Sequence, residues 1–139
     1  MAIAAVLTGC ASTAPVDPGA TPEELVLITH GSFALGEDNE VLDRFTEQTG
    51  IAVTVLQADD AGALTNQLVL TKDNPVGDVV FGIDNTFATR AVEEGVFDAY
   101  APELPAGAEQ HELPGDDGDA LTPVDTGAVC VNVDRAWFR

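Results

Sequence analysis

One stretch decides the fold class: Gly77-Asp78-Val79-Val80-Phe81-Gly82-Ile83-Asp84-Asn85. Its apolar, β-branched centre is typical of a strand buried on both faces, so we expect a central strand of a parallel sheet here. Gly82 permits a tight turn, and Asp84-Asn85 follow where the next helix is expected to begin. Because ligands of open α/β sheets bind at the carboxyl ends of strands, this acid and this amide are candidate ligand-binding residues.

Strands and helices alternate along the chain before and after this stretch. Two more β-rich runs precede it, and each run is followed by apolar residues at helical spacing. The expected strands are Leu25–Thr29 and Ile51–Leu56, and the expected helices are one capped by Asp38 or Asn39 and stopped by Gly50, one over about Ala61–Thr71 capped by Asp59-Asp60, and one over Thr86–Glu94. This order predicts an α/β fold with a mostly parallel sheet and helices on both faces.

The sequence changes character after residue 100. Residues 101–119 are rich in Pro, Gly and acids, which predicts a long surface loop, and the run Asp116-Asp117-Gly118-Asp119 lacks the twelve-residue calcium-loop pattern. Apolar residues return in Ala128–Val133, which predicts another strand, with Cys130 as a buried thiol within it. A further helix is expected to begin at Asp134.

The charge of the chain narrows the class of partner. Lys and Arg number 5 against 24 Asp and Glu, which gives a formal net charge of −19. Such a chain repels nucleic acids and anionic membrane surfaces, so neither is an expected partner. A small cationic ligand would be attracted, although a merely solvated acidic surface has the same composition.

The N-terminus resembles a bacterial lipobox. A short apolar run, Ala2–Leu7, leads into Leu7-Thr8-Gly9-Cys10, and no Lys or Arg precedes it. The resemblance implies a partial signal peptide over residues 1–10 with Cys10 as the lipidated residue, followed by a flexible, proline-rich linker over residues 11–24. It also implies an extracytoplasmic lipoprotein, periplasmic or at the cell surface, held at the membrane by its lipid.

Three stretches in the same order resemble the thiamine-type substrate-binding proteins of ABC importers. They are Leu27–Phe33 with its Ser-Phe turn, Asp78–Asn85 with its Gly-x-Asp-Asn sequence, and Pro123–Phe138. The resemblance implies a periplasmic-binding-protein-like fold of type II, whose two lobes close on thiamine or its phosphates and deliver the ligand to a permease and ATPase. Residues 25–122 would form the first lobe and residues 123–139 a crossover toward a second lobe that is missing from this chain. The chain alone is therefore expected to bind thiamine weakly or not at all.

The sequence departs from the family pattern at three places. Gly31 stands where an acid usually precedes the Ser-Phe pair, and Thr126 stands where a tyrosine is usual. No aromatic residue accompanies Glu37 after the first-strand turn. These departures reduce the charged and aromatic groups available to a thiazolium ring.

The candidate ligand-binding residues offer the groups that thiamine requires. A carboxylate about 4 Å from the thiazolium charge contributes on the order of 4 kcal/mol at an effective dielectric constant near 20, and an aromatic face about 0.5–2 kcal/mol. Asn85 matches a pyrimidine edge, and Ser32 with nearby backbone N–H groups matches a phosphate. The candidates are His30, Ser32, Phe33, Asp84, Asn85 and Asp125. Alternatively, these residues only cap helices and hold turns.

Other functions fit the sequence less well. A hydrolase would need a base and a nucleophile facing each other, whereas His30 and Ser32 share one turn, and no Gly-x-Ser-x-Gly or phosphate-binding glycine motif occurs. The chain has only His30 and His111 to offer as imidazole ligands of a catalytic metal. We therefore expect no enzyme activity, no catalytic residues, no metal and no cofactor. Ferric iron, a polyamine or a phosphonate remain alternative ligands for the same fold.

Overall fold

The computed structural model describes residues 22–35, 39–113, 119–128 and 130–137. Cys10, Asp38 and the run 116–118 lie outside the described residues, as does the linker up to residue 21. The elements are β1 (Glu24–Thr29), α1 (Glu40–Thr49), β2 (Ala52–Gln57), α2 (Ala61–Thr71), β3 (Val79–Phe81), α3 (Ala88–Glu93) and the 3-10 turn η1 (Ala108–His111). Strands and helices thus alternate as expected for an α/β fold.

The sheet is open and entirely parallel among the described residues, with the strand order β2-β1-β3. The expectation that the Gly77–Asn85 stretch holds a central strand is wrong for this sheet. β3 has three residues and pairs with β1 only, and Val79 is 46% exposed. The central place belongs to β1, where Ile28 and Thr29 are fully covered. An apolar run therefore indicated a strand correctly but not its position in the sheet.

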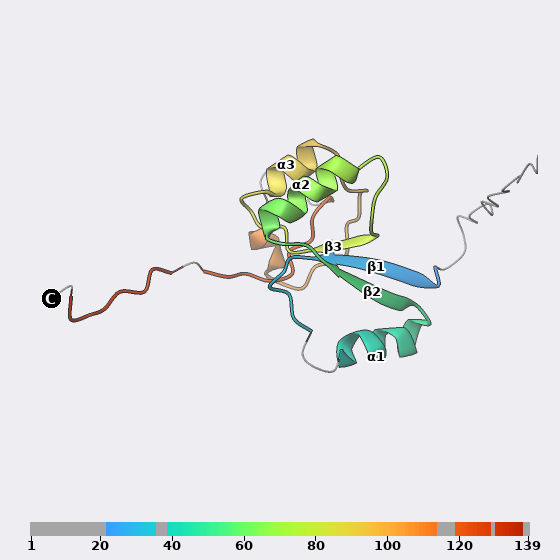
Figure 1. The fold of residues 1–139 in the computed structure, drawn as a ribbon, viewed down its shortest axis with the longest axis horizontal. Helices are drawn as coiled ribbons and strands as arrows, with labels where there is room; N and C mark the ends of the chain where they lie inside the picture. The colour runs from blue at the N-terminus through green and yellow to red at the C-terminus, as the bar shows by residue number, and fades with distance from the viewer. Residues whose placement is uncertain (1–21, 36–38, 114–118, 129, 138–139) are drawn as a thin grey trace, which may run out of the picture.

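Helices cover both faces of the sheet, as Figure 1 shows: α1 lies on one side, and α2 and α3 lie together on the other. The buried cluster lies on the second side, where Leu64 and Leu68 of α2 pack against Ile28 of β1. On the first side α1 contributes no buried residue, and its Val41 is exposed. The core is therefore one-sided, and α1 only partly covers its face of β2.

Two of the three residues expected to cap a helix by local hydrogen bonding do so in the structure. Asp60 caps α2, because its Oδ1 accepts from the Ala63 N–H at 2.7 Å. Gly50 ends α1 in a left-handed conformation (φ 76°), and its N–H donates to the Thr46 carbonyl. Asn39 stands at the start of α1, but its side chain makes no capping hydrogen bond.

The C-terminal part differs from its predicted structure. The described residues of 128–133 form no strand, and Figure 1 shows this segment extending away from the sheet. Val131 is 88% exposed and Cys130 is exposed, so the expected burial of this thiol is wrong. Asp134 begins a single turn, in which its carboxylate accepts from the Ala136 N–H at 2.8 Å. An apolar pattern forms a strand only where a partner strand is present.

One ion pair joins the ends of α2 and α3, and its contribution to stability should depend on pH. Lys72 Nζ lies 3.0 Å from Glu94 Oε2 and also donates to the Glu94 carbonyl. The hydrogen bond from Lys72 lowers the pKa of Glu94, and the charges of Lys72 and Arg90 act in the same direction. Because the folded pKa is depressed, the stabilisation is present above the ordinary value of 4.5 and is lost as the pH falls through the lower, folded value.

We expect Glu94→Gln to lower the urea midpoint slightly at pH 7 and not at pH 3. The difference should also shrink at high salt, because the pair is partly exposed. Glu93→Gln is the matched control. Glu93 is the acid next to Glu94 in the sequence, and its carboxylate forms no ion pair among the described residues. A difference that persists at pH 3 would show that Glu94 acts through something other than its charge.

Candidate functional site

The carboxyl ends of the three strands are joined into one surface, which we call the strand-end rim (residues 30–33, 58–60 and 82–85). The turn after β1 is bound to both neighbours: the His30 N–H donates to the Phe81 carbonyl at 3.3 Å, and the Gly31 N–H donates to the Asp59 carbonyl at 2.6 Å. The Ala58 N–H completes the connection by donating to the Thr29 carbonyl. Parallel pairing thus brings together three turns that are far apart in the sequence.

Three aromatic side chains gather at this rim. The His30 ring stacks on Phe81 with centroids 5.9 Å apart, and the Phe33 ring tilts against Phe81 at 5.0 Å. All three are half-buried. Gly82 is required beneath them, because its φ is 112° and a Cβ there would overlap the His30 ring. We call His30, Phe33 and Phe81 the aromatic cluster.

His30 and Ser32 are bound to each other through a local contact. The Ser32 backbone N–H donates to His30 Nδ1 at 3.2 Å, so the proton of a neutral ring lies on Nε2. The Ser32 side chain itself is exposed. This contact fixes the orientation of the His30 ring over Gly82 and does not form a base–nucleophile pair.

The carboxylates of the rim have different roles. Asp84 Oδ1 accepts from the N–H groups of Thr86 and Phe87, so one of its oxygens caps the turn that leads to α3. Asp60 is the cap of α2. The exposed Asp59 carboxylate has no hydrogen-bond partner within the described part of the chain.

Asp59 is the rim residue that sequence reasoning missed. The two tandem acids were expected to cap the next helix together, but a helix has one N-cap position and Asp60 occupies it. The Asp59 carbonyl accepts from the Gly31 N–H, which places the backbone of this exposed residue at the rim. The signal in the sequence was this second acid, which a single cap leaves unused.

The structure thus gathers five of the six predicted ligand-binding residues. His30, Ser32 and Phe33 follow β1, and Asp84 with the exposed Asn85 follow β3. Asp125 lies in the exposed C-terminal segment, and no hydrogen bond or ion pair joins it to a rim residue that the structure describes.

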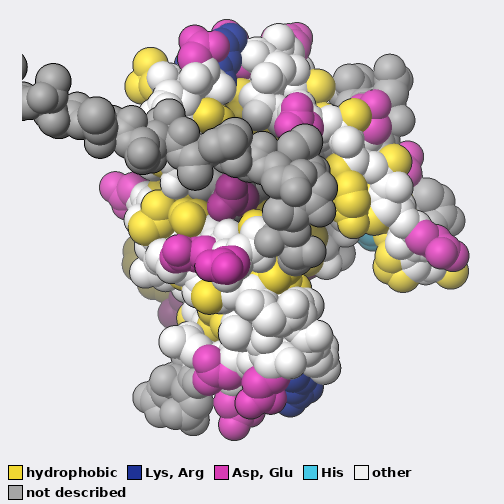
Figure 2. Space-filling view, turned by 90° about the vertical axis from the view of Figure 1, so that its right-hand side faces the viewer, with side chains coloured by type: hydrophobic (Ala, Val, Ile, Leu, Met, Phe, Trp, Pro, Cys, Tyr) yellow, Lys and Arg dark blue, Asp and Glu magenta, His cyan; other side chains and the backbone are white. Residues whose placement is uncertain are grey.

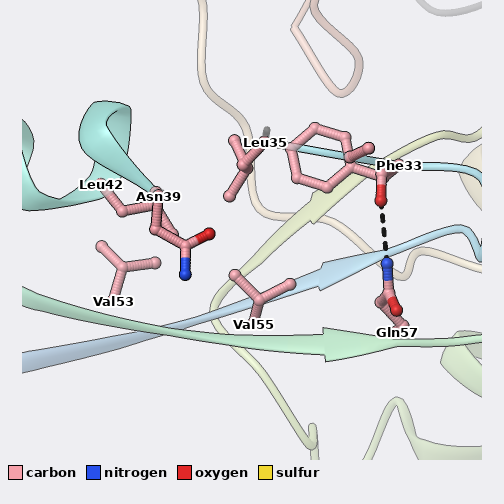
Figure 3. A pocket seen from close by; sticks show the side chains of 8 residues that line it. Phe33, Leu35, Asn39, Leu42, Val53, Val55 and Gln57 are labelled. Carbon is pink, nitrogen blue, oxygen red and sulfur yellow. Dashed lines mark hydrogen bonds between the residues drawn. The ribbon is translucent and has the colours of Figure 1, made fainter. Parts of the chain in front are cut away.

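A groove of about 600 Å³ opens beside the rim, between α1 and β2 (Figure 3). Side chains of β2 form its floor, α1 and the residue before it form a wall, and the segment 33–35 closes one end, where the Phe33 carbonyl accepts from Gln57 Nε2 at 2.8 Å. Among the lining residues that the structure describes, none is ionisable. Its main lining residues are Phe33, Asn39, Leu42, Val53, Val55 and Gln57. We call it the α1–β2 groove.

Acidic side chains dominate the charged groups on the molecular face seen in Figure 2, where Lys and Arg appear only in small areas. Among the described residues, no group of three or more His, Cys, Asp or Glu side chains could hold a metal ion. Nor is any helix in the described ranges long and apolar enough to cross a membrane. The groups that the rim offers to a ligand are thus the separate carboxylates of Asp59 and Asp84 and the rings of the aromatic cluster.

No family model matches the chain, and no curated protein matches it.

Proposed function

We propose that this chain is the ligand-binding first lobe of an extracytoplasmic solute-binding protein that captures a small organic cation. Thiamine, or one of its phosphates, is the best candidate ligand, and an ABC permease with its ATPase is the proposed receiver. The observation that supports this proposal is that the half-buried aromatic cluster and the exposed residue Asp59 belong to the same rim, at the carboxyl ends of a parallel sheet.

The chemistry of the rim favours a cation over an anion or a neutral ligand. An aromatic face attracts a cation by about 0.5–2 kcal/mol. The exposed Asp59 adds about 1 kcal/mol at 4 Å in a water-like dielectric, and a value nearer 4 kcal/mol if the site closes and excludes water. The formal net charge of −19 draws cations toward the same surface.

The remaining parts of the proposal concern the whole protein. The lobe belongs to a type II periplasmic-binding-protein-like fold, with residues 123–139 leading to a second lobe. Asp125 would contribute to the ligand site from that crossover segment. Cys10 carries the lipid that anchors the protein outside the cytoplasm. The protein has no enzymatic role in this proposal and needs no cofactor.

A polyamine is the second candidate ligand, because Asp59 and Asp84 present two separate exposed carboxylates at one rim. Separate carboxylates suit the separate ammonium groups of a polyamine. Thiamine differs by also offering flat rings to the aromatic cluster. Spermidine is therefore the appropriate competitor in any binding experiment.

A titration of the isotope-labelled chain with thiamine, followed by amide NMR spectra, tests the proposal. Because this lobe would supply only part of the proposed site, binding should be weak. We expect a dissociation constant of about 1 mM, so thiamine is added to about 10 mM. The amide signals of residues 30–33, 58–60 and 82–85 should shift. Asp59→Asn should raise the dissociation constant about fivefold at low salt, with a smaller effect at high salt.

Asp73→Asn is the matched control, because it removes the same charge just beyond the C-terminal end of α2. Its effect on thiamine affinity should be at most about twofold, since screened charges act over about 10 Å. Equal effects of the two variants would reduce the role of Asp59 to net charge. The absence of shifts at the rim would refute the proposal, and a preference for spermidine would select the second ligand.

A further inference from the structure

Asn39 has an unusual conformation at the wall of the α1–β2 groove. It is the one residue other than glycine with positive φ (48°) in the described ranges, although its N-cap position gains no side-chain hydrogen bond. Figure 3 shows its amide projecting over Val53 and Val55 of the groove floor. Such conformations cluster at ligand sites, and a free amide offers both a donor and an acceptor.

A second observation concerns Thr29, which is the β1 partner of the groove residue Gln57. Thr29 is 0% exposed, and its Oγ1 has no hydrogen-bond partner in the described structure. Thr29 is paired in register with Gln57 on one side and with Phe81 on the other, so the three side chains share one face of the sheet. Buried hydroxyls without a partner are uncommon and destabilising, so the Thr29 hydroxyl lacks a hydrogen bond that a buried hydroxyl normally has.

Phe33 connects this row to the rim. Its carbonyl accepts from Gln57, and its ring contacts Phe81 within the aromatic cluster. Phe33 is also a lining residue of the groove. Phe33 therefore belongs to both parts of the surface: it closes the end of the groove that is nearer the rim, and its ring is part of the aromatic cluster, so the groove and the rim adjoin at this residue.

The two parts of this surface differ in charge. The rim carries the carboxylates of Asp59 and Asp84, whereas none of the described residues that line the groove is ionisable. The groove volume lies in the range of small-molecule pockets, and its floor is formed by apolar side chains. An uncharged, flat ring suits the groove, and a cation suits the rim.

We propose that the α1–β2 groove is a subsite for the uncharged heteroaromatic ring of the ligand, with the Asn39 amide as the hydrogen-bonding partner of its edge. The proposal rests on the proposed function and specifies its ligand class: a cation linked to a flat, hydrogen-bonding ring. For thiamine, the thiazolium lies at the rim and the aminopyrimidine lies in the groove. This assigns the pyrimidine edge to Asn39 in place of Asn85.

The two halves of thiamine provide the test, because each should bind one part of the surface. In amide and methyl NMR spectra of the chain, the free aminopyrimidine should shift the signals of Asn39, Val53 and Val55. A thiazolium salt should instead shift those of Gly82 and Asp84. Intact thiamine should shift both groups.

Two variants test the role of Asn39 and of the groove itself. Asn39→Gly removes the amide in a conformation that glycine adopts readily, so folding should be unchanged while aminopyrimidine affinity falls about tenfold. Val53→Phe should fill the groove and also abolish the aminopyrimidine shifts. Thiazolium binding should survive both changes.

Matched controls separate these effects from general damage. Asn74→Gly makes the same change in an exposed turn after α2, and Val41→Phe adds the same ring on the exposed side of α1. Neither should alter aminopyrimidine binding. Urea midpoints of all four variants show whether folding is intact.

Each outcome decides between the two proposals. Thiamine shifts at the rim without shifts in the groove would overturn the subsite and leave the proposed function standing. Groove shifts that Asn39→Gly leaves unchanged would overturn the role of Asn39. No shifts at either place would overturn the subsite together with the function on which it rests.

Discussion

Replacing Gly82 with alanine should destabilise the chain by about 2–5 kcal/mol and should displace His30 from Phe81. The backbone at Gly82 has φ 112°, which strains any residue with a Cβ. The new methyl group would also overlap Cδ2 of the His30 ring and lie 2.9 Å from its Cγ. Strain and overlap act together at this position, which makes the expected effect large.

Two other glycines separate these contributions. Gly95→Ala tests backbone strain alone, because φ is 63° and nothing lies within 4 Å of its added Cβ. Gly77→Ala tests overlap without positive φ, because its Cβ would lie 2.6 Å from Ile28 Cγ1. Urea unfolding measures all three changes, and the ring signals of His30 report its displacement. If Gly82→Ala were no more harmful than Gly95→Ala, the close approach of His30 to Gly82 would be wrong.

Truncating Leu64 to alanine should lower the free energy of unfolding by about 2–5 kcal/mol. Leu64 is 0% exposed and packs with Ile28 and Leu68 in a small cluster. A domain is stable by only about 5–15 kcal/mol, so the loss should leave a chain that is partly unfolded at moderate temperature. Urea unfolding followed by circular dichroism gives the measurement.

Leu70→Ala is the matched control on the same helix. Leu70 is 83% exposed, so the same truncation there should change the free energy of unfolding by less than about 0.5 kcal/mol. Both variants keep a strong helix former, which removes helix propensity as an explanation. Equal losses at the two positions would contradict the placement of the core between α2 and β1.

Local chemistry explains which parts of the fold the sequence predicted. The bounds of α2 agree with expectation because Asp60 supplies a cap and Leu64 and Leu68 have helical spacing. The end of α1 at Gly50 agrees for a similar reason. Caps and periodicity depend on residues a few positions apart, so they can be read directly from the chain.

Long-range packing explains what the sequence did not predict. The position of β3 beside β1 depends on strand pairing, and the described residues of the apolar run 128–133 pair with no described strand. The interpretation as a type II binding-protein lobe goes beyond what a three-stranded parallel sheet establishes.

The candidate site was predicted in part for the same physical reasons. Parallel strands bring their carboxyl ends together, so His30 and Asp84 were expected at one rim. The Asp59 carboxylate was missed because both adjacent acids were assigned to the helix cap, whereas the single N-cap position of α2 is occupied by Asp60. The α1–β2 groove arises from how loosely α1 covers β2, which no local pattern in the sequence encodes.

The one-sided core has a consequence for how the molecule fluctuates. Separating α2 from the sheet exposes the buried cluster and requires near-global unfolding, whereas α1 buries no residue and moves away at much smaller cost. We therefore expect α1, which forms the wall of the groove, to move away from β2 and back while the three strands keep their register. A ligand of the proposed subsite would therefore enter from the α1 side and leave the pairing of the three strands unchanged.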